Sequence, residues 1–293
     1  MRTSNWTEKI VNILVYATLA VLCVVTLYPF VYVLMYSISD AASASARNIT
    51  LYPIGFTLDN YKAVFADNRI LDAFWVSAAR TVLGTTLHLI VTGLAAYAFS
   101  KEELVFRRKL LLFFIIPLYF SGGLLPFYVQ IINLDLYNRF LVYILPTAIG
   151  VFNMLVMKVF FEQLPKSLEE SAKIDGAGDF KVFVNIFIPS SMPVVATIVM
   201  FIGVQQWNSW FDALLFVNKS ELMPLQALLY KIILENQATT IEQLARLSNA
   251  NVSVTPEAIK MTTLILTTVP MLAVYPFLQK YFVKGMMIGA VKG

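Results

Sequence analysis

The chain has 293 residues, of which 58% are hydrophobic and only 14% are charged, and its mean hydropathy is +0.71. Because soluble domains carry about 25% charged residues, this composition excludes an ordinary soluble domain and indicates a membrane protein. The single cysteine and single histidine exclude an internal disulfide and metal sites built from several such residues. The net charge of +4 comes from basic residues that flank apolar segments, unlike a nucleic-acid surface with interleaved aromatics.

Six apolar segments follow one another along the chain, and each can cross about 30 Å of hydrocarbon as a helix of about 20 residues. The first segment follows Arg2 and Lys9. It is longer than the roughly 7–15 apolar residues of a signal peptide, so we expect it to be retained, although Ala44-Ser45-Ala46 resembles a signal-peptidase site. The predicted spans cover roughly residues 10–38, 70–99, 110–132, 140–161, 194–217 and 258–283.

The connections between these segments differ in length and charge. A polar stretch after the first span contains Thr57-Leu58-Asp59, which predicts the capped start of a short external helix. A short charged turn, residues 101–109, follows the second span, and an external loop of residues 218–257 carries apolar residues at helical spacing. Four prolines inside the predicted spans favour helices that bend around a central path: Pro117, Pro146, Pro270 and Pro276.

The distribution of lysine and arginine orients the chain. Six spans place both termini on one side, which also receives the charged turn and the loop of residues 162–193. Basic residues are concentrated on that side, whereas those on the other side are spread over longer loops, so the first side is predicted to be cytoplasmic. The predicted fold class is therefore an all-α polytopic membrane protein with six transmembrane helices and both termini in the cytoplasm.

The cytoplasmic loop of residues 162–193 reads as a helix, a turn and a second helix. Ser167 and Glu170 have the spacing of a capping box, which predicts a first helix starting near Leu168. Gly176 is suited to the left-handed conformation that ends a helix. A second helix is predicted from Gly178 or Asp179 to Pro189, where it must kink or stop. Such a pair of short helices would form a knob shaped for a partner.

The same loop carries a resemblance to a known family. Glu170-Ser171-Ala172, then Gly176 after three residues, then Ile186-Phe187-Ile188-Pro189 resembles the EAA loop of ATP-binding-cassette (ABC) importer permeases. Asp175-Gly176-Ala177 and the spacing to Pro193 are similar to the carbohydrate-importing, maltose-type class. Ser171 stands where the family has alanine, but it is also small. The ending, residues 281–293, resembles a subgroup that handles complex oligosaccharides, including an oligoalginate importer.

This resemblance implies a type I ABC importer permease in which residues 1–293 form a single transmembrane permease domain. It implies import of an oligosaccharide, with an acidic, alginate-like one as the best guess, across the bacterial cytoplasmic membrane. The implied partners are two cytoplasmic ABC ATPase subunits, a second homologous permease, membrane lipid and an external solute-binding protein. The implied ATPase-coupling residues are Glu170, Ser171, Ala172, Asp175, Gly176, Ala177, Phe180, Phe183, Ile186 and Pro189.

Within the coupling loop, the resemblance places Glu170 opposite a basic group of the ATPase, although a capping role alone would also explain this glutamate. The tail, residues 285–293, would reach into the ATPase pair or remain disordered. No phosphate-binding loop, Gly-x-Ser-x-Gly elbow or His-Glu-x-x-His pair occurs in the sequence. We therefore expect no enzyme activity, cofactor or metal on this chain, and ATP and Mg²⁺ on the partner ATPase.

Polar residues inside the predicted spans are candidates for a substrate path. Arg80 is expected to pair with Asp72 or to face an acidic substrate, or else to snorkel to the interface or pair at a subunit contact. His88 lines the path or is a packed polar residue. The segment from Gln205 to Asp212 mixes aromatic rings with amides, which suits sugar rings but also describes an aromatic belt. The candidate path residues are Arg80, His88, Gln206, Trp207, Asn208, Trp210 and Asp212.

Two other functions are alternatives to an ABC permease. A secondary, ion-coupled transporter would also have broken helices and buried charges, but it needs paired repeats and a coupling carboxylate deep in a span. The sequence offers no convincing candidate for that carboxylate. A structural membrane scaffold without transport would leave the cytoplasmic loop without a role.

Overall fold

The computed structural model describes residues 6–40, 44, 51–237 and 254–290. Every regular element among these residues is helical, so the predicted all-α class is confirmed for this part of the chain. The chain divides into two compact units, Met1–Asn68 with Lys231–Val269, and Arg69–Tyr230 with Pro270–Gly293. Parts of three predictions lie outside the described residues: the Ala44-Ser45-Ala46 site, the external loop from residue 238 to 253, and the last three residues of the tail.

The first unit contains α1 (Trp6–Ser37) and α3 (Asp59–Ala66). The apolar side chains of α1 are exposed from Ile10 to Phe30, as in a helix whose surface meets lipid or another chain. The C-terminal end of α1 is fastened to α3 by the buried Asn60, whose amide nitrogen donates to the Ser37 carbonyl at 3.0 Å and the Ser39 carbonyl at 2.8 Å. The helix α3 begins at Asp59, where its start was predicted, but its N-cap Leu58 supplies no side-chain cap; the Thr57 hydroxyl accepts a hydrogen bond from the Asp59 amide at 3.1 Å.

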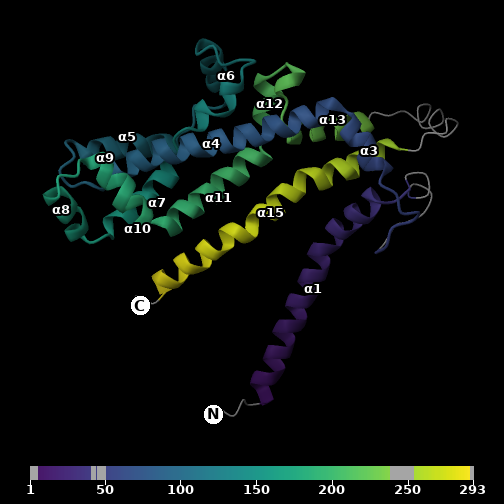
Figure 1. The fold of residues 1–293 in the computed structure, drawn as a ribbon, viewed down its shortest axis with the longest axis horizontal. Coiled ribbons are helices and arrows are strands. Elements are labelled where there is room, and N and C mark those ends of the chain that lie inside the picture. Colours follow the sequence, from purple (N-terminus) through teal and green to yellow (C-terminus); the bar gives the residue numbers. More distant parts are fainter. Residues whose placement is uncertain (1–5, 41–43, 45–50, 238–253, 291–293) are drawn as a thin grey trace. The chain divides into compact units, whose positions relative to one another are not determined.

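The second unit is built along α4 (Asn68–Ser100), a helix of 33 residues (Figure 1). It continues with α5 (Arg107–Tyr119), α6 (Leu124–Asn133), the short 3-10 helices η1 (Phe140–Tyr143) and η2 (Leu145–Thr147), and α7 (Val151–Glu162). Next come α8 (Lys166–Ile174), α9 (Asp179–Val182), the π-helical segment η3 (Phe183–Phe187), α10 (Ile188–Ser190) and α11 (Met192–Asn208). The remaining elements, two of which extend into the first unit, are α12 (Phe211–Phe216), η4 (Ser220–Leu222), α13 (Leu225–Gln237) and α15 (Pro256–Ala290).

Three helices in the described part are long and apolar enough to cross a membrane unaided: Glu8–Ser37, Asn68–Ser100 and Pro256–Val274. Three bent pairs bring the number to as many as six if each pair is one span. The pairs are α5 with α6, bent by 116°, the segment Phe140–Thr147 with α7, bent by 47°, and Asp179–Ser190 with α11, bent by 86°. The apolar segments are therefore helical as predicted, while the six-span count and the cytoplasmic termini stay predictions.

The predicted bends are found near only two of the four prolines. The chain turns sharply between α5 and α6 at Gly123, whose φ of +84° is accessible mainly to glycine, and Pro117 lies six residues earlier, inside α5. Pro146 lies in the 3-10 segment before α7. Pro270 and Pro276, in contrast, lie inside α15, which runs without interruption from Pro256 to Ala290.

Two clusters of buried apolar side chains hold the second unit together. At the C-terminal end of α4, Tyr97 packs against Phe183 and Phe187 of η3, and both phenylalanines also contact Phe161 of α7. Figure 1 shows α5, α7, α9 and α10 gathered at this end of α4. The other cluster joins α6, η1, α12 and the start of α13, with Tyr143 and Phe216 among its buried members. Both clusters fix the ends of the broken helices that carry the candidate site.

Replacing Asn60 with leucine tests the attachment of α1 to α3. The change removes both hydrogen bonds to the carbonyls of Ser37 and Ser39, so the free energy of unfolding should fall by about 1–3 kcal/mol. Thermal unfolding of the detergent-solubilised protein measures this loss. Lys62→Gln removes only an exposed ion pair with Asp59 on the same helix and should leave the midpoint almost unchanged. Equal midpoints for the two variants would contradict the assigned role of Asn60.

Candidate functional site

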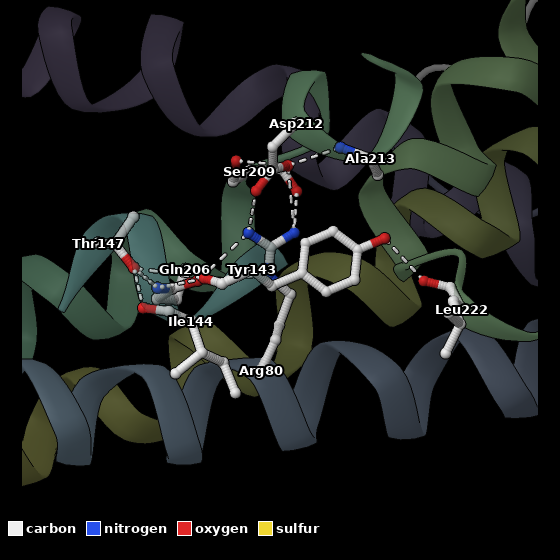
Figure 2. Close-up of polar contacts among 9 residues, drawn as sticks. All are labelled: Arg80, Tyr143, Ile144, Thr147, Gln206, Ser209, Asp212, Ala213 and Leu222. Carbon is white, nitrogen blue, oxygen red and sulfur yellow. Dashed lines mark hydrogen bonds and ion pairs between the residues drawn. The ribbon is translucent and has the colours of Figure 1, made fainter. Parts of the chain in front are cut away.

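A buried arginine lies at the centre of the polar network in the second unit. The Arg80 side chain on α4 is 1% exposed, and its Nη2 atom forms an ion pair with Asp212 Oδ2 at 2.5 Å. Its Nη1 atom donates to Asp212 Oδ1 at 3.3 Å and to the Ser209 carbonyl at 3.2 Å. Gln206 Oε1 accepts from Nε at 3.3 Å and from Nη2 at 3.2 Å. Figure 2 shows the guanidinium group held between these partners.

The same network extends from Arg80 to the breaks of three helices. The guanidinium carbon lies 4.3 Å from the centre of the Tyr143 ring, and the Tyr143 hydroxyl donates to the Leu222 carbonyl at 2.8 Å. Gln206 Nε2 donates to the Tyr143 carbonyl at 3.1 Å and to the Thr147 hydroxyl at 2.7 Å (Figure 2). One cation thus connects α4 with η1, η2, α11, α12 and η4.

The predicted partner of Arg80 was wrong. Asp72 is exposed, and the anion is Asp212, 132 residues away in sequence. Neither the expected snorkelling nor the exposure to substrate is observed, because the guanidinium is enclosed and neutralised within the chain. A buried charge must find an opposite charge, and Asp212 lies just after the break between α11 and α12, where backbone groups are also free to accept.

Gly84 creates the room for Gln206. It lies one turn after Arg80 on the same face of α4, and a Cβ atom at this position would lie only 2.6 Å from Gln206 Nε2. A side chain here would force Gln206 away from Arg80. No local sequence pattern indicates this contact, because several helices separate Gly84 from Gln206 along the chain.

His88 lies deeper along α4 and is connected to the arginine network through Thr147. Its Nδ1 atom lies 2.6 Å from the Thr147 carbonyl, which can only accept, so Nδ1 carries the proton. Its Nε2 atom then accepts from Asn153 Nδ2 at 2.9 Å. Gly150 allows this approach, since a Cβ there would lie 2.7 Å from the imidazole. Of the two alternatives for His88, the structure therefore favours the packed polar residue.

The aromatic residues of the predicted path lie apart from the arginine network. Trp207 is buried, meets Phe74 edge-on at 5.9 Å between ring centres, and lines an apolar cavity of about 570 Å³ between α4, α11 and α15. Trp210 stacks on Tyr230 at 4.3 Å. Asn208 is exposed and accepts a hydrogen bond from Gln226 at 3.2 Å. Of the seven predicted path residues, only Arg80, Gln206 and Asp212 meet directly.

The predicted coupling residues divide into an exposed tip and a buried base. Gly176 has a φ of +79° and separates α8 from α9, as predicted. Beside it, Ile174 is 85% exposed and Phe180 is also exposed, as is Glu170. Phe183 is buried at the base of the same loop, where it packs against Tyr97 of α4. Ser171, Asp175 and Pro189 are exposed, whereas Ala172, Ala177 and Ile186 are partly covered.

Of two local predictions for this loop, one was wrong and one is confirmed. The helix α8 begins at Lys166 with Pro165 at its N-cap, and no side chain caps it. Ser167 therefore lies inside the first turn, where it cannot form the predicted capping box. The second helix ends at Ser190, one residue after Pro189, and an 86° bend follows at Ser191, so the predicted kink or stop at this proline is confirmed to within two residues. The π-helical segment η3, directly before α10, accommodates Pro189, which has no backbone N–H to donate.

Glu169 is the functional candidate that the sequence analysis missed. It forms ion pairs with Lys101, in the turn after α4, and with Lys173 at 2.9 Å. Lys173 also reaches Asp179 of α9 at 3.3 Å. Burial raises the pKa of Glu169, but the hydrogen bonds from Lys101 and Lys173 outweigh it and lower the pKa overall. The spacing of Glu169 and Lys173 on one helix face was readable, whereas the contact with Lys101 was not.

Residues 1–288 match the model of a protein family described as the binding-protein-dependent transport system inner membrane component. The chain belongs to this family. It is a multi-pass inner-membrane permease of the ABC importer type. The permease is 36% identical over 287 residues to the polygalacturonan/rhamnogalacturonan transport system permease protein YtcP of Bacillus subtilis, covering 98% of this chain and 99% of that protein. It is 42% identical over 270 residues to the B. subtilis protein LplC, covering 92% and 90%.

Solved structures agree with this assignment. The permease superimposes with a TM-score of 0.89 and 27% identity on a chain of a bacterial ABC transporter involved in the import of the acidic polysaccharide alginate, covering 96% of this chain and all of that one. A bacterial alginate ABC transporter in complex with a periplasmic protein that holds an alginate pentasaccharide shares the fold, with a TM-score of 0.61 and 15% identity over 93% and 95% of the two chains.

Replacing Asp212 with asparagine tests the ion pair at the centre of the network. The change keeps the shape but leaves the Arg80 charge buried without an anion, which should cost about 3–5 kcal/mol of stability. Thermal unfolding in detergent measures the effect. Asp135→Asn removes the partner of Arg139 in an exposed ion pair and should cost at most about 1 kcal/mol. Similar losses for the two variants would show that the Arg80 pair does not hold the helices.

Proposed function

We propose that this permease is the transmembrane subunit of an ATP-driven importer that carries an acidic oligosaccharide, alginate-like or pectin-like, across the cytoplasmic membrane. The proposal rests on one observation: a sequence relative and a superimposed structure are both named for transport of acidic polysaccharides. A relative at 36% identity is named for polygalacturonan and rhamnogalacturonan, and the superimposed transporter chain at 27% identity belongs to an importer of alginate. These polymers share sugar rings that carry carboxylates.

The arginine network does not by itself explain selection of an acidic sugar. Arg80 is neutralised by Asp212, so its guanidinium offers no free charge to a carboxylate in this conformation. Selection of the substrate is therefore assigned first to an external solute-binding protein, which would deliver it to the outer side of the permease. A second homologous permease would complete the path, as expected for a family of binding-protein-dependent systems.

The energy source is assigned to a separate pair of ATPase subunits, which would bind ATP and Mg²⁺. Their docking point is the loop from α8 to α10, whose tip presents the exposed Ile174 and Phe180 on either side of Gly176. Exposed apolar residues at a tight turn suit a cleft in a partner. The exposed Glu170 is placed to meet a basic group of that partner.

Uptake by proteoliposomes tests the substrate and the energy source together. The complex that co-purifies with the tagged permease is reconstituted with its solute-binding protein, and radiolabelled oligogalacturonate, oligoalginate and a neutral arabino-oligosaccharide are supplied outside. We expect uptake of an acidic oligosaccharide that requires ATP inside and persists with a proton ionophore. Uptake of the neutral sugar alone would contradict the substrate class. Uptake driven by an ion gradient without ATP would instead indicate a secondary transporter.

Substitutions at two neighbouring glycines test the coupling turn. Gly176 needs its φ of +79°, and an alanine there should cost about 1–2 kcal/mol of local strain without a clash, since no atom lies within 4 Å of the added Cβ. Gly176→Pro cannot adopt this angle at all and should abolish ATP-driven uptake while membrane insertion remains normal. Gly178 has a φ of −72° and equally open surroundings, so Gly178→Ala is the matched control. Normal uptake by Gly176→Pro would contradict the coupling role.

A further inference from the structure

A lysine at the end of α4 contacts the coupling helix α8. Lys101 directly follows the last residue of α4 and forms an ion pair with Glu169 of α8. Both side chains are only 19% exposed. The Lys101 ammonium also lies 4.1 Å from the ring centre of Tyr97 on α4 and 4.4 Å from that of Phe187 in η3. A single cation therefore contacts both ends of the coupling loop and the end of α4.

A second ion pair joins the same two segments and offers a comparison. Lys166 of α8 lies 3.1 Å from Glu102 in the turn after α4, but these side chains are 76% and 69% exposed. Exposed pairs contribute little because water and salt screen them. The Lys101 pair is shielded, and its cation gains further attraction from the faces of two aromatic rings. Of the two contacts, only the one through Lys101 has the surroundings of a firm attachment.

Glu169 extends this attachment across the coupling turn. Lys173 pairs with Glu169 at 2.9 Å and with Asp179 at 3.3 Å, so the charge chain runs from Lys101 through α8 to the first residue of α9. Because the Lys173 and Asp179 side chains are 50% and 72% exposed, this outer pair adds little, and the attachment rests on Lys101 and Glu169. The lowered pKa of Glu169, where burial is outweighed by hydrogen bonds from two lysines, keeps its carboxylate charged at neutral pH.

The other end of this chain of contacts is the arginine network. Arg80 lies 20 residues before Ser100 on the uninterrupted α4, a distance of about 30 Å along the helix axis. A continuous helix passes a displacement at one end to the other end. Movement of α8 that reaches Lys101 would therefore reach the helix breaks around Arg80.

We propose that Lys101 is a positioning residue for transport: it fastens the coupling helix α8 to α4, so that a displacement of α8 by the ATPase moves α4. This inference rests on the proposed function, namely on an ATPase docking at the tip of the coupling loop. Neither the sequence motif of the loop nor the family description contains Lys101, which lies about 70 residues before Glu170 in the sequence.

The test measures uptake and ATP hydrolysis by the complete complex with Lys101→Met, Lys101→Arg and Lys166→Met. Lys101→Met should lower uptake at least about tenfold, which is equivalent to about 1.4 kcal/mol. ATP hydrolysis should fall much less, because the ATPase would then turn over without moving α4. Lys101→Arg keeps the charge and the ring contacts and should restore most of the uptake. Lys166→Met, the matched control on the exposed pair, should behave like the unmodified chain.

A spectroscopic measurement separates attachment from general stability. Cys23, the natural cysteine, is replaced by serine, and spin labels are placed at the exposed Val105 in the turn and Ser167 on α8. The distance distribution between the labels in the purified complex should broaden with Lys101→Met and stay narrow with Lys166→Met. An unchanged distribution, or a broadened one with normal uptake, would overturn the proposal. Absence of ATP-driven uptake in the unmodified complex would instead remove the proposed function on which it rests.

Discussion

A buried cation organises the permease. Arg80 lies in a helix apolar enough to span a membrane, where an unpaired charge is costly, and its neutralisation by Asp212 brings α4 and the break after α11 together. The surrounding helix breaks depend on the same set of side chains. The carbonyl of Ser209 is satisfied by Arg80, that of Tyr143 by Gln206, and that of Leu222 by the Tyr143 hydroxyl. In an apolar medium an interrupted helix is tolerated only where such partners exist.

The second polar centre, around Lys101 and Glu169, lies at the C-terminal end of α4 and differs in character from the arginine network. Its ion pair is partly exposed to solvent, and it lies next to the exposed tip of the coupling loop. It joins the end of α4 to α8, two segments that are separated in the sequence. The arginine network fixes helix breaks within the unit, whereas the lysine attachment faces the side on which a partner is proposed to act. Because α4 is continuous between them, the two centres would connect the proposed coupling loop with the proposed transport path.

Local features of the chain were predictable from sequence, and long-range contacts were not. The apolar runs located the helices, and the left-handed backbone conformation of Gly176 followed from its place between two short helices. Asp212 was named as a candidate, but its partnership with Arg80 spans 132 residues and no local pattern encodes it. The start of α8 was misplaced because the capping-box spacing was present without its geometry. The prolines of α15 were read as breaks, yet the helix continues through both of them.

The most direct test of an ATP-coupled permease is purification of the tagged chain from its native membrane in mild detergent, with mass spectrometric identification of stoichiometric partners. We expect a second permease and an ABC ATPase to co-purify, and we expect the ATPase to be lost when the coupling turn is disrupted. A chain that purifies alone and takes up sugar on an ion gradient would contradict this expectation.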